Sequence, residues 1–367
     1  MKKLFVLLVV FAVLAMPVSV YAADDYGADG LYDNLPDDAK SSLSSIGIDR
    51  FDINSLKDIS VDSILSEILN SVAEQSKSPL RVLSVITAVL LLDSLLYGIK
   101  SSYDNSSLHQ ALSLCITLCV TGALVIPIIE VVNSSIEAIK TVSGFMLAYI
   151  PVIAVIMTAS GQAVSGQSYY VMINIAGQAV SRISADIISP LLKLFLGLSI
   201  SSAVASNVSL SGLIRFISRT SKWILGFIFG IFTAVLSFRQ VISSGLDNVG
   251  SKAMRFTISS LVPVVGSALS EAYRTVQGSL GLLKSGVGVF AVIAVIVMFA
   301  PVLCQCVLWM FVIWASKTLG ELFGIRDVCV LLESVGEVVS VIFAMLLCVM
   351  SVFIISTASV LVLGGAG

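Results

Sequence analysis

Long apolar runs separated by short polar segments dominate this sequence from residue 80 onward. An apolar run of about 20 residues can cross a bilayer as a helix, so the pattern predicts an all-α polytopic membrane bundle with about seven spans. The predicted spans, which number seven give or take one, are 82–99, 111–132, 142–160, a fourth and a fifth within 169–206 that break around "RISADIISP", 223–238, 289–315 and 338–363.

The first 22 residues have the pattern of a secretory signal peptide. Lys2 and Lys3 precede an apolar stretch, which ends in the small-residue sequence "VYA". This order predicts cleavage after Ala22 and export of the segment that begins at residue 23. An uncleaved first transmembrane helix is the alternative that the same residues allow.

Residues 23–79 form an acidic segment with ten Asp and two Glu against four Lys or Arg. Pro36 and Gly47 are placed as the start and stop signals of a helix. A second helix is predicted from apolar residues at helical spacing, namely Ile64, Leu65, Ile68, Leu69 and Val72. So short a segment cannot build a core of its own. We therefore expect a small extracytoplasmic domain of two or three helices, docked on the membrane domain (80–367) or on a partner.

The stretch 210–222 has apolar residues on one helical face and Arg215, Arg219 and Lys222 on the opposite face. This pattern predicts an interfacial helix whose basic stripe meets lipid headgroups on the cytoplasmic side. In the next predicted span, Gly226 and Gly230 have the GxxxG spacing that lets helices pack closely. Chance is the alternative explanation in a chain so rich in glycine.

The segment 260–288, "SLVPVVGSALSEAYRTVQGSLGLLKSGVG", interrupts the apolar pattern with breakers and charges. One interpretation is a re-entrant element at the centre of the bundle, because irregular backbone at membrane depth must be buried or line a cavity. The other is an amphipathic helix on the extracytoplasmic surface. Under the first interpretation, the candidate structural or pore residues are Pro263, Gly266, Ser270, Glu271, Arg274, Lys284, Gly286 and Gly288.

Composition and motifs argue against several classes of function. A mean hydropathy of +1.02 with 12% charged residues is far from a soluble domain. No Lys/Arg block indicates a nucleic-acid surface. A single His and six cysteines without metal-ligand spacing predict neither a metal site nor a disulfide framework. "GSLGLLKS" (278–285) imitates a phosphate-binding loop but has Leu283 where the loop needs glycine. We therefore expect no enzyme activity and no cofactor.

The order of these parts resembles the stage III sporulation protein AE family of endospore-forming bacteria. The resemblance covers essentially the whole chain and is most specific from Arg215 to Gly288, across "RFISRTSKWILGFIFGIFTAVLS" and the interrupted segment. It implies a non-enzymatic multi-pass subunit in the mother-cell membrane around the forespore. The implied partners are other membrane subunits of the same operon, in a channel-like complex needed for forespore development after engulfment.

The expected partners include the lipid bilayer and exclude nucleic acid. Formation of a homo-oligomer is left open.

The alternative function is a secondary transporter for a small solute or ion, because transporters use broken helices in two related halves. The segment "IISPLLKLFLGLSISS" is only a weak second candidate for such a broken helix.

Overall fold

The computed structural model describes residues 28, 30–51, 60–100, 106–183, 186, 189–204, 211–261 and 266–362. Within these ranges the chain forms helices joined by short turns, and no strand occurs there, so the predicted all-α class is confirmed. The predicted cleavage position Ala22 and the predicted helix breaker Pro263 lie outside the described residues.

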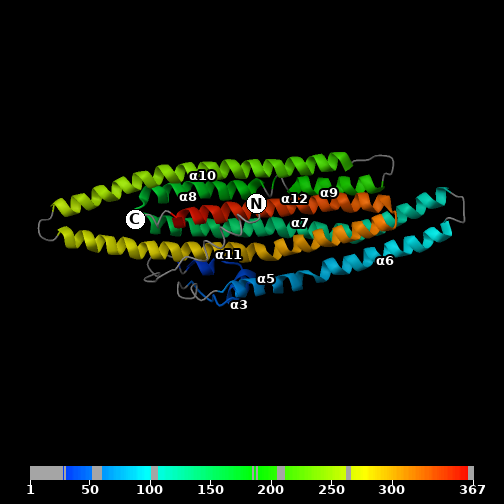
Figure 1. The fold of residues 1–367 in the computed structure, drawn as a ribbon, viewed down its shortest axis with the longest axis horizontal. Helices are drawn as coiled ribbons and strands as arrows, with labels where there is room; N and C mark the ends of the chain where they lie inside the picture. Colours follow the sequence, from blue (N-terminus) through cyan, green and yellow to red (C-terminus); the bar gives the residue numbers. More distant parts are fainter. Residues whose placement is uncertain are drawn as a thin grey trace.

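The helices form an elongated bundle (Figure 1). Helices α7, α10 and α11 run along most of its length, the shorter α12 lies among them, α8 and α9 lie end to end beside α10, and the N-terminal helices pack on one side near α11. The helices are α2 (Gly30–Asp33), α3 (Asp37–Ser45), α5 (Val61–Gln75), α6 (Lys77–Lys100), α7 (Ser106–Ala159), α8 (Ala163–Arg182), α9 (Ser189–Val204), α10 (Ser211–Leu261), α11 (Gly266–Leu322) and α12 (Arg326–Val362).

Helix α7 corrects the predicted division into two spans. The spans 111–132 and 142–160 are parts of one helix of 54 residues, and Pro127 and Pro151 lie inside it. A helix of this length extends about 81 Å at 1.5 Å per residue. The polar stretch between the two predicted spans contains neither Gly nor Pro, so nothing in it stops the helix.

Helix α10 shows that a second predicted boundary, between residues 222 and 223, is wrong. The predicted interfacial helix 210–222 and the predicted span 223–238 belong to one helix that continues to Leu261. No glycine or proline stands at the predicted boundary, so the helix has no local reason to end there. The interfacial helix is therefore the first part of a long bundle helix.

The interrupted segment lies where two long helices end. Leu261 ends α10 and Gly266 begins α11, and Figure 1 shows both ends at the same extremity of the bundle. Residues 262–265 lie outside the described ranges. The flanking backbone therefore does not support a re-entrant element at the centre of the bundle. Further along α11, Pro301 lies inside the helix and does not end it.

The predicted break within 169–206 is confirmed, since α8 ends at Arg182 and α9 begins at Ser189. Two separate spans within 169–206 would require the chain to reverse direction at this break, and it does not do so. Figure 1 shows α8 and α9 following one another along the bundle, and both contact α7. The break therefore interrupts a helical path without turning it back.

Five helical segments of the described chain are long and apolar enough to cross a membrane. Three of them have 43 to 49 residues, about twice the ~20 residues that one crossing needs. These segments suit a membrane protein, but they do not reproduce the count of about seven spans. They are Lys77–Leu96, Ala111–Ala159, Gly212–Met254, Thr275–Leu322 and Arg326–Leu361.

The acidic N-terminal segment docks on the bundle. Helix α3 follows Pro36, and Gly47 after its end has φ +88°, as its start and stop signals predict. Phe51 is buried, and its ring meets Phe290 of α11 edge-on at 5.5 Å between centroids. The predicted apolar face of α5 is only partly covered, because Leu65 and Leu69 are mostly exposed while Ile64, Ile68 and Val72 are half-buried.

Candidate functional site: two polar layers in an apolar bundle

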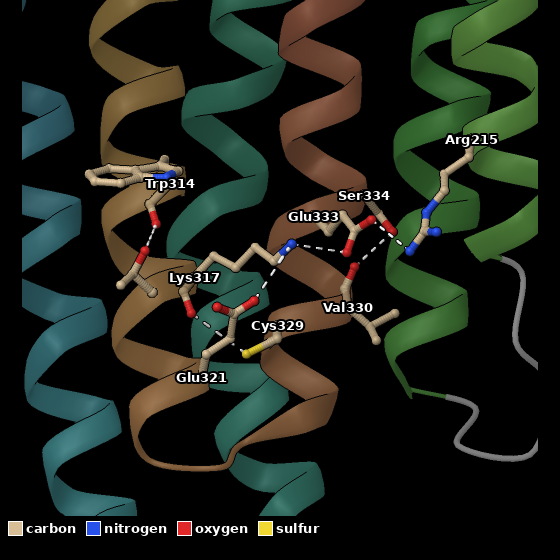
Figure 2. A network of polar contacts seen from close by, with 9 residues as sticks. Arg215, Trp314, Lys317, Glu321, Cys329, Val330, Glu333 and Ser334 are labelled. Carbon is tan, nitrogen blue, oxygen red and sulfur yellow. Dashed lines mark hydrogen bonds and ion pairs between the residues drawn. The ribbon is translucent and has the colours of Figure 1, made fainter.

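Charged side chains of α10, α11 and α12 meet in an ionic layer, which we define as Arg215, Lys222, Lys317, Glu333 and Glu337. The carboxylate of Glu333 on α12 contacts cationic side chains from two other helices (Figure 2). Its Oε1 lies 2.7 Å from a guanidinium nitrogen of Arg215, and its Oε2 lies 3.1 Å from Nζ of Lys317. One carboxylate of α12 therefore ties together α10 and α11.

Glu337 stands one helical turn after Glu333, so both carboxylates lie on one face of α12. Oε2 of Glu337 lies 3.0 Å from Nζ of Lys222 and also accepts a hydrogen bond from the hydroxyl of Ser218, which is buried. Two neighbouring carboxylates thus fix the register of α12 against α10. Charge-assisted contacts of this kind are about twice as strong as neutral ones.

Two further contacts complete the layer at the turn between α11 and α12. Nζ of Lys317 lies 3.7 Å from Glu321 one turn later, and the thiol of Cys329 lies 3.7 Å from the backbone oxygen of Lys317 (Figure 2). The cations of the layer are engaged by carboxylates of the same bundle. The arrangement suits helix registration and offers no activated nucleophile or base.

Two of the three residues of the predicted basic stripe form ion pairs within the bundle, and the contact of this stripe with lipid headgroups stays a prediction. Arg215 and Lys222 pair with α12, whereas the side chain of Arg219 is exposed. Sequence reasoning missed Glu333 and Glu337. The available signal was "LLESVGEVV", in which two glutamates stand four apart in an apolar run, a pattern that marks partnered ionisable residues.

A second group, which we call the polar end layer, consists of Gln162, Asp247 and Lys284. Lys284 is fully buried, and its Nζ donates to Oε1 of Gln162 at 3.0 Å. Gln162 lies in the turn between α7 and α8, so this contact joins that turn to α11. The candidate Lys284 is thus placed inside the bundle, and its partner is a neutral amide that sequence reasoning did not single out.

Asp247 of α10 holds the start of α8. Its two carboxylate oxygens accept from the backbone N–H groups of Val164 and Ser165, each at 2.9 Å, and the side chain is 8% exposed. The first N–H groups of a helix have no partner within the helix. A carboxylate from a distant helix satisfies two of them and faces the positive end of the helix dipole.

Asp247→Ala should lower the free energy of unfolding by about 2 kcal/mol, because the N–H group of the buried Ser165 and that of Val164 both lose a charged acceptor. Unfolding of the full chain in mixed micelles with increasing SDS would measure the change. Asn248→Ala is the matched control, since Asn248 is the exposed neighbour on the same helix. Equal losses in the two variants would contradict the capping role of Asp247.

The structure describes the other predicted site residues only in part. Gly266, Ser270, Glu271 and Arg274 lie in the first turns of α11, where the side chains of Glu271 and Arg274 are outside the description. Gly286 is buried. A Cβ at Gly288 would come within 2.5 Å of Leu361, so this glycine permits close packing of α11 on α12.

The predicted GxxxG pair finds no partner helix within the described chain. Gly226 and Gly230 leave open space around them, because a Cβ at either position would meet nothing within 4 Å. Close helix packing through these glycines stays a prediction. In the described ranges, no three His, Cys, Asp or Glu side chains are grouped to hold a metal ion.

Comparison with known proteins identifies related sequences. The family model "Stage III sporulation protein AE" matches residues 50–364. A curated relative, "Stage III sporulation protein AE" of Bacillus subtilis (strain 168), is 23% identical over 331 residues, which cover 90% of this chain and 81% of the relative. No solved structure matches the chain.

Proposed function

The chain belongs to the stage III sporulation protein AE family, and from this premise we propose that it is a non-enzymatic subunit of a sporulation channel complex. In this proposal it acts as a scaffold or pore component in the mother-cell membrane around the forespore. Its partners are other membrane subunits of the same operon, and further copies of the chain can join it. The acidic N-terminal domain faces the space between the two membranes.

The observation that carries the proposal is the ionic layer. Its carboxylates are engaged by cations of neighbouring helices, at 2.7 to 3.1 Å, and so fix helix positions. Catalytic groups differ, because they must keep a proton or a lone pair for the substrate. A rigid bundle with a large apolar surface suits a subunit that is held among lipids and other membrane proteins.

Much of α10 is available for such contacts. In the candidate span Gly212–Met254 only 6% of the most apolar stretch is buried inside the bundle. Exposed large side chains include Trp223, Phe227 and Ile231. A helix that is apolar on its outer face in a membrane protein contacts lipid or another subunit.

A secondary transporter is the second candidate, and the interruption between α8 and α9 favours it. Transporters bind their substrates at discontinuous helices. The two functions differ in when the cell needs the protein. A transporter for a solute would change uptake or growth in vegetative cells, whereas a sporulation subunit would not.

Deleting the gene and restoring the full chain from another locus tests the proposal. We expect sporulation to stop after engulfment, vegetative growth to stay normal, and the restored copy to rescue both spore formation and co-purification of the other operon subunits from sporulating cells. A growth defect without a sporulation defect would favour the transporter. Recovery of the tagged chain as a lone monomer or dimer from sporulating cells would contradict the scaffold.

A further inference from the structure

The part of the bundle that contains α6 has an apolar surface on two opposite sides. Helices α6 and α10 lie on opposite sides of the bundle (Figure 1). On α6, Leu91, Leu92 and Leu95 are 47%, 57% and 75% exposed. On the first part of α10, Phe216 and Trp223 are 66% and 67% exposed. Because lipid surrounds any bundle that crosses a bilayer, this part has the surface that a crossing needs.

The acidic N-terminal helices exclude lipid from the level at which they pack. Both α3 and α5 contact α11, and Phe51, which follows α3, packs on Phe290 of α11. The outer surfaces of the two helices carry exposed carboxylates, namely Asp37 and Asp38 of α3 and Asp62 and Glu74 of α5. An Asp at the centre of a bilayer costs about 3 kcal/mol. The bilayer therefore does not surround the bundle at this level.

The level of Pro301 divides the two parts. Gln75, the last residue of α5, and Pro301 of α11 line the same cleft. Helix α5 therefore ends, and α6 begins, beside Pro301. We call the part of the bundle beside residues 301–322 of α11 the α6 half, and the part beside residues 266–300 the α5 half.

Exposed charges gather near the same level on other helices. Ser135 of α7 lies beside Cys306 of α11, which places the polar stretch of α7 close to Pro301. Figure 1 shows the interruption between α8 and α9 near the middle of the bundle. Charged side chains of membrane proteins favour the boundary between lipid and water. The exposed charges near this level are Lys77 and Arg81 of α6, Glu137 and Lys140 of α7, and Arg182 and Asp186 at the interruption.

The length of the α6 half matches one bilayer. The hydrocarbon core of a bilayer is about 30 Å thick. From Pro301 to its end at Leu322, α11 extends about 32 Å, and the 24 residues of α6 extend about 36 Å. Exposed charges also mark the far limit of this half, where Arg215 and Glu321 are each 60% exposed.

Helix α10 changes in character along its length in the same direction. Between Lys222 and Arg239 it has no charged side chain, whereas Arg239, Asp247 and Lys252 follow at short intervals. Arg239 and Lys252 are exposed. The charge-free stretch of α10 therefore ends on the side of the α5 half.

We propose that the bilayer surrounds only the α6 half, and that the α5 half projects into the aqueous space on the side of the acidic helices. Six described helices then cross the bilayer once each, namely α6, α7, α9, α10, α11 and α12. Helix α9 is the shortest of them, with 16 residues and a length of about 24 Å. An even number of crossings places the end of α12 at Val362 on the same side as α3. This inference goes beyond the proposed function, because the relative placement holds for a channel subunit and for a transporter.

Labelling of single cysteines with a membrane-impermeant maleimide tests the sidedness in the full chain, after replacement of the six native cysteines by alanine. Asp38, Asn248 and Glu321 are exposed. Asp38→Cys and Asn248→Cys should label from one face of the membrane, and Glu321→Cys only from the opposite face. Labelling of Asn248→Cys from the same face as Glu321→Cys would overturn the proposal. If Asp38→Cys and Asn248→Cys label together from the cytoplasmic face, the proposal stands and the extracytoplasmic placement of the acidic domain is wrong.

A matched pair of residues on α10 tests the depth of the bilayer. Ile224 and Val249 are apolar residues of this helix and are 45% and 68% exposed. In phosphatidylcholine and phosphatidylglycerol vesicles that contain brominated lipid, a bimane label on Ile224→Cys should be quenched severalfold more strongly than one on Val249→Cys. Equal quenching would mean that lipid covers α10 along its whole length, as in a bundle that lies flat on the membrane, and would overturn the proposal. Stronger quenching at Val249→Cys would overturn it as well, because the bilayer would then surround the α5 half.

Discussion

Glu337→Lys should destabilise the bundle by about 3 kcal/mol. The substitution places an ammonium group beside Lys222, which now lies 3.0 Å from the Glu337 carboxylate. Two like charges about 4 Å apart repel by about 4 kcal/mol at an effective dielectric constant of about 20. Both side chains are about one third exposed, so screening by solvent reduces this value.

The reversed pair provides the decisive comparison. The double variant Lys222→Glu with Glu337→Lys restores one cation and one carboxylate at the same positions, and it should recover at least half of the lost free energy. Unfolding in mixed micelles with SDS can be followed by tryptophan fluorescence, because Trp309 of α11 is buried in the fold and becomes exposed on unfolding. Glu130→Lys is the control for the charge change itself, because Glu130 is exposed on α7. If the double variant is no more stable than the single one, the pairing across α10 and α12 does not contribute to stability.

Local signals in the sequence predict the parts of the fold that depend on neighbouring residues. The all-α class follows from the apolar runs, the start of α3 follows from Pro36 and its acidic first turn, and the interruption after Arg182 follows from the polar segment there. Helix continuity was predicted wrongly. Hydropathy falls between residues 132 and 142, but the residues there still form a helix because none of them disfavours it strongly.

The ionic layer was only half predictable, because its partners are far apart in sequence. Arg215 was recognised as part of a basic face, yet Glu333 lies 118 residues later and on another helix. An ionisable residue in an apolar run predicts that a partner exists, but the local sequence does not identify which residue that partner is. Lys284 was found for this reason. Gln162 was missed because a neutral amide in a turn carries no such signal.

Lys284 and Gln162 form one pair, but substitutions at the two positions should have very different effects on the free energy of unfolding. Lys284→Met should leave the free energy of unfolding unchanged or raise it by up to about 2 kcal/mol. The amine is fully buried and donates one hydrogen bond that the structure shows, so an apolar side chain of similar length avoids the cost of desolvation. Gln162→Leu should lower it by about 3 kcal/mol, because the buried amine then loses its acceptor.

The double variant, Lys284→Met with Gln162→Leu, separates this pair from everything else that Gln162 contacts. If the loss in Gln162→Leu arises from the stranded amine, removing the amine should restore most of the stability, and the coupling between the two sites should reach about 2 kcal/mol. SDS-driven unfolding of all four proteins measures that coupling directly. A Lys284→Met variant that is less stable than the wild type would show that the buried amine stabilises the fold. A Lys284→Met variant that is stable but fails to support spore formation would instead assign the amine to function, since a group kept at a cost to folding is retained for another reason.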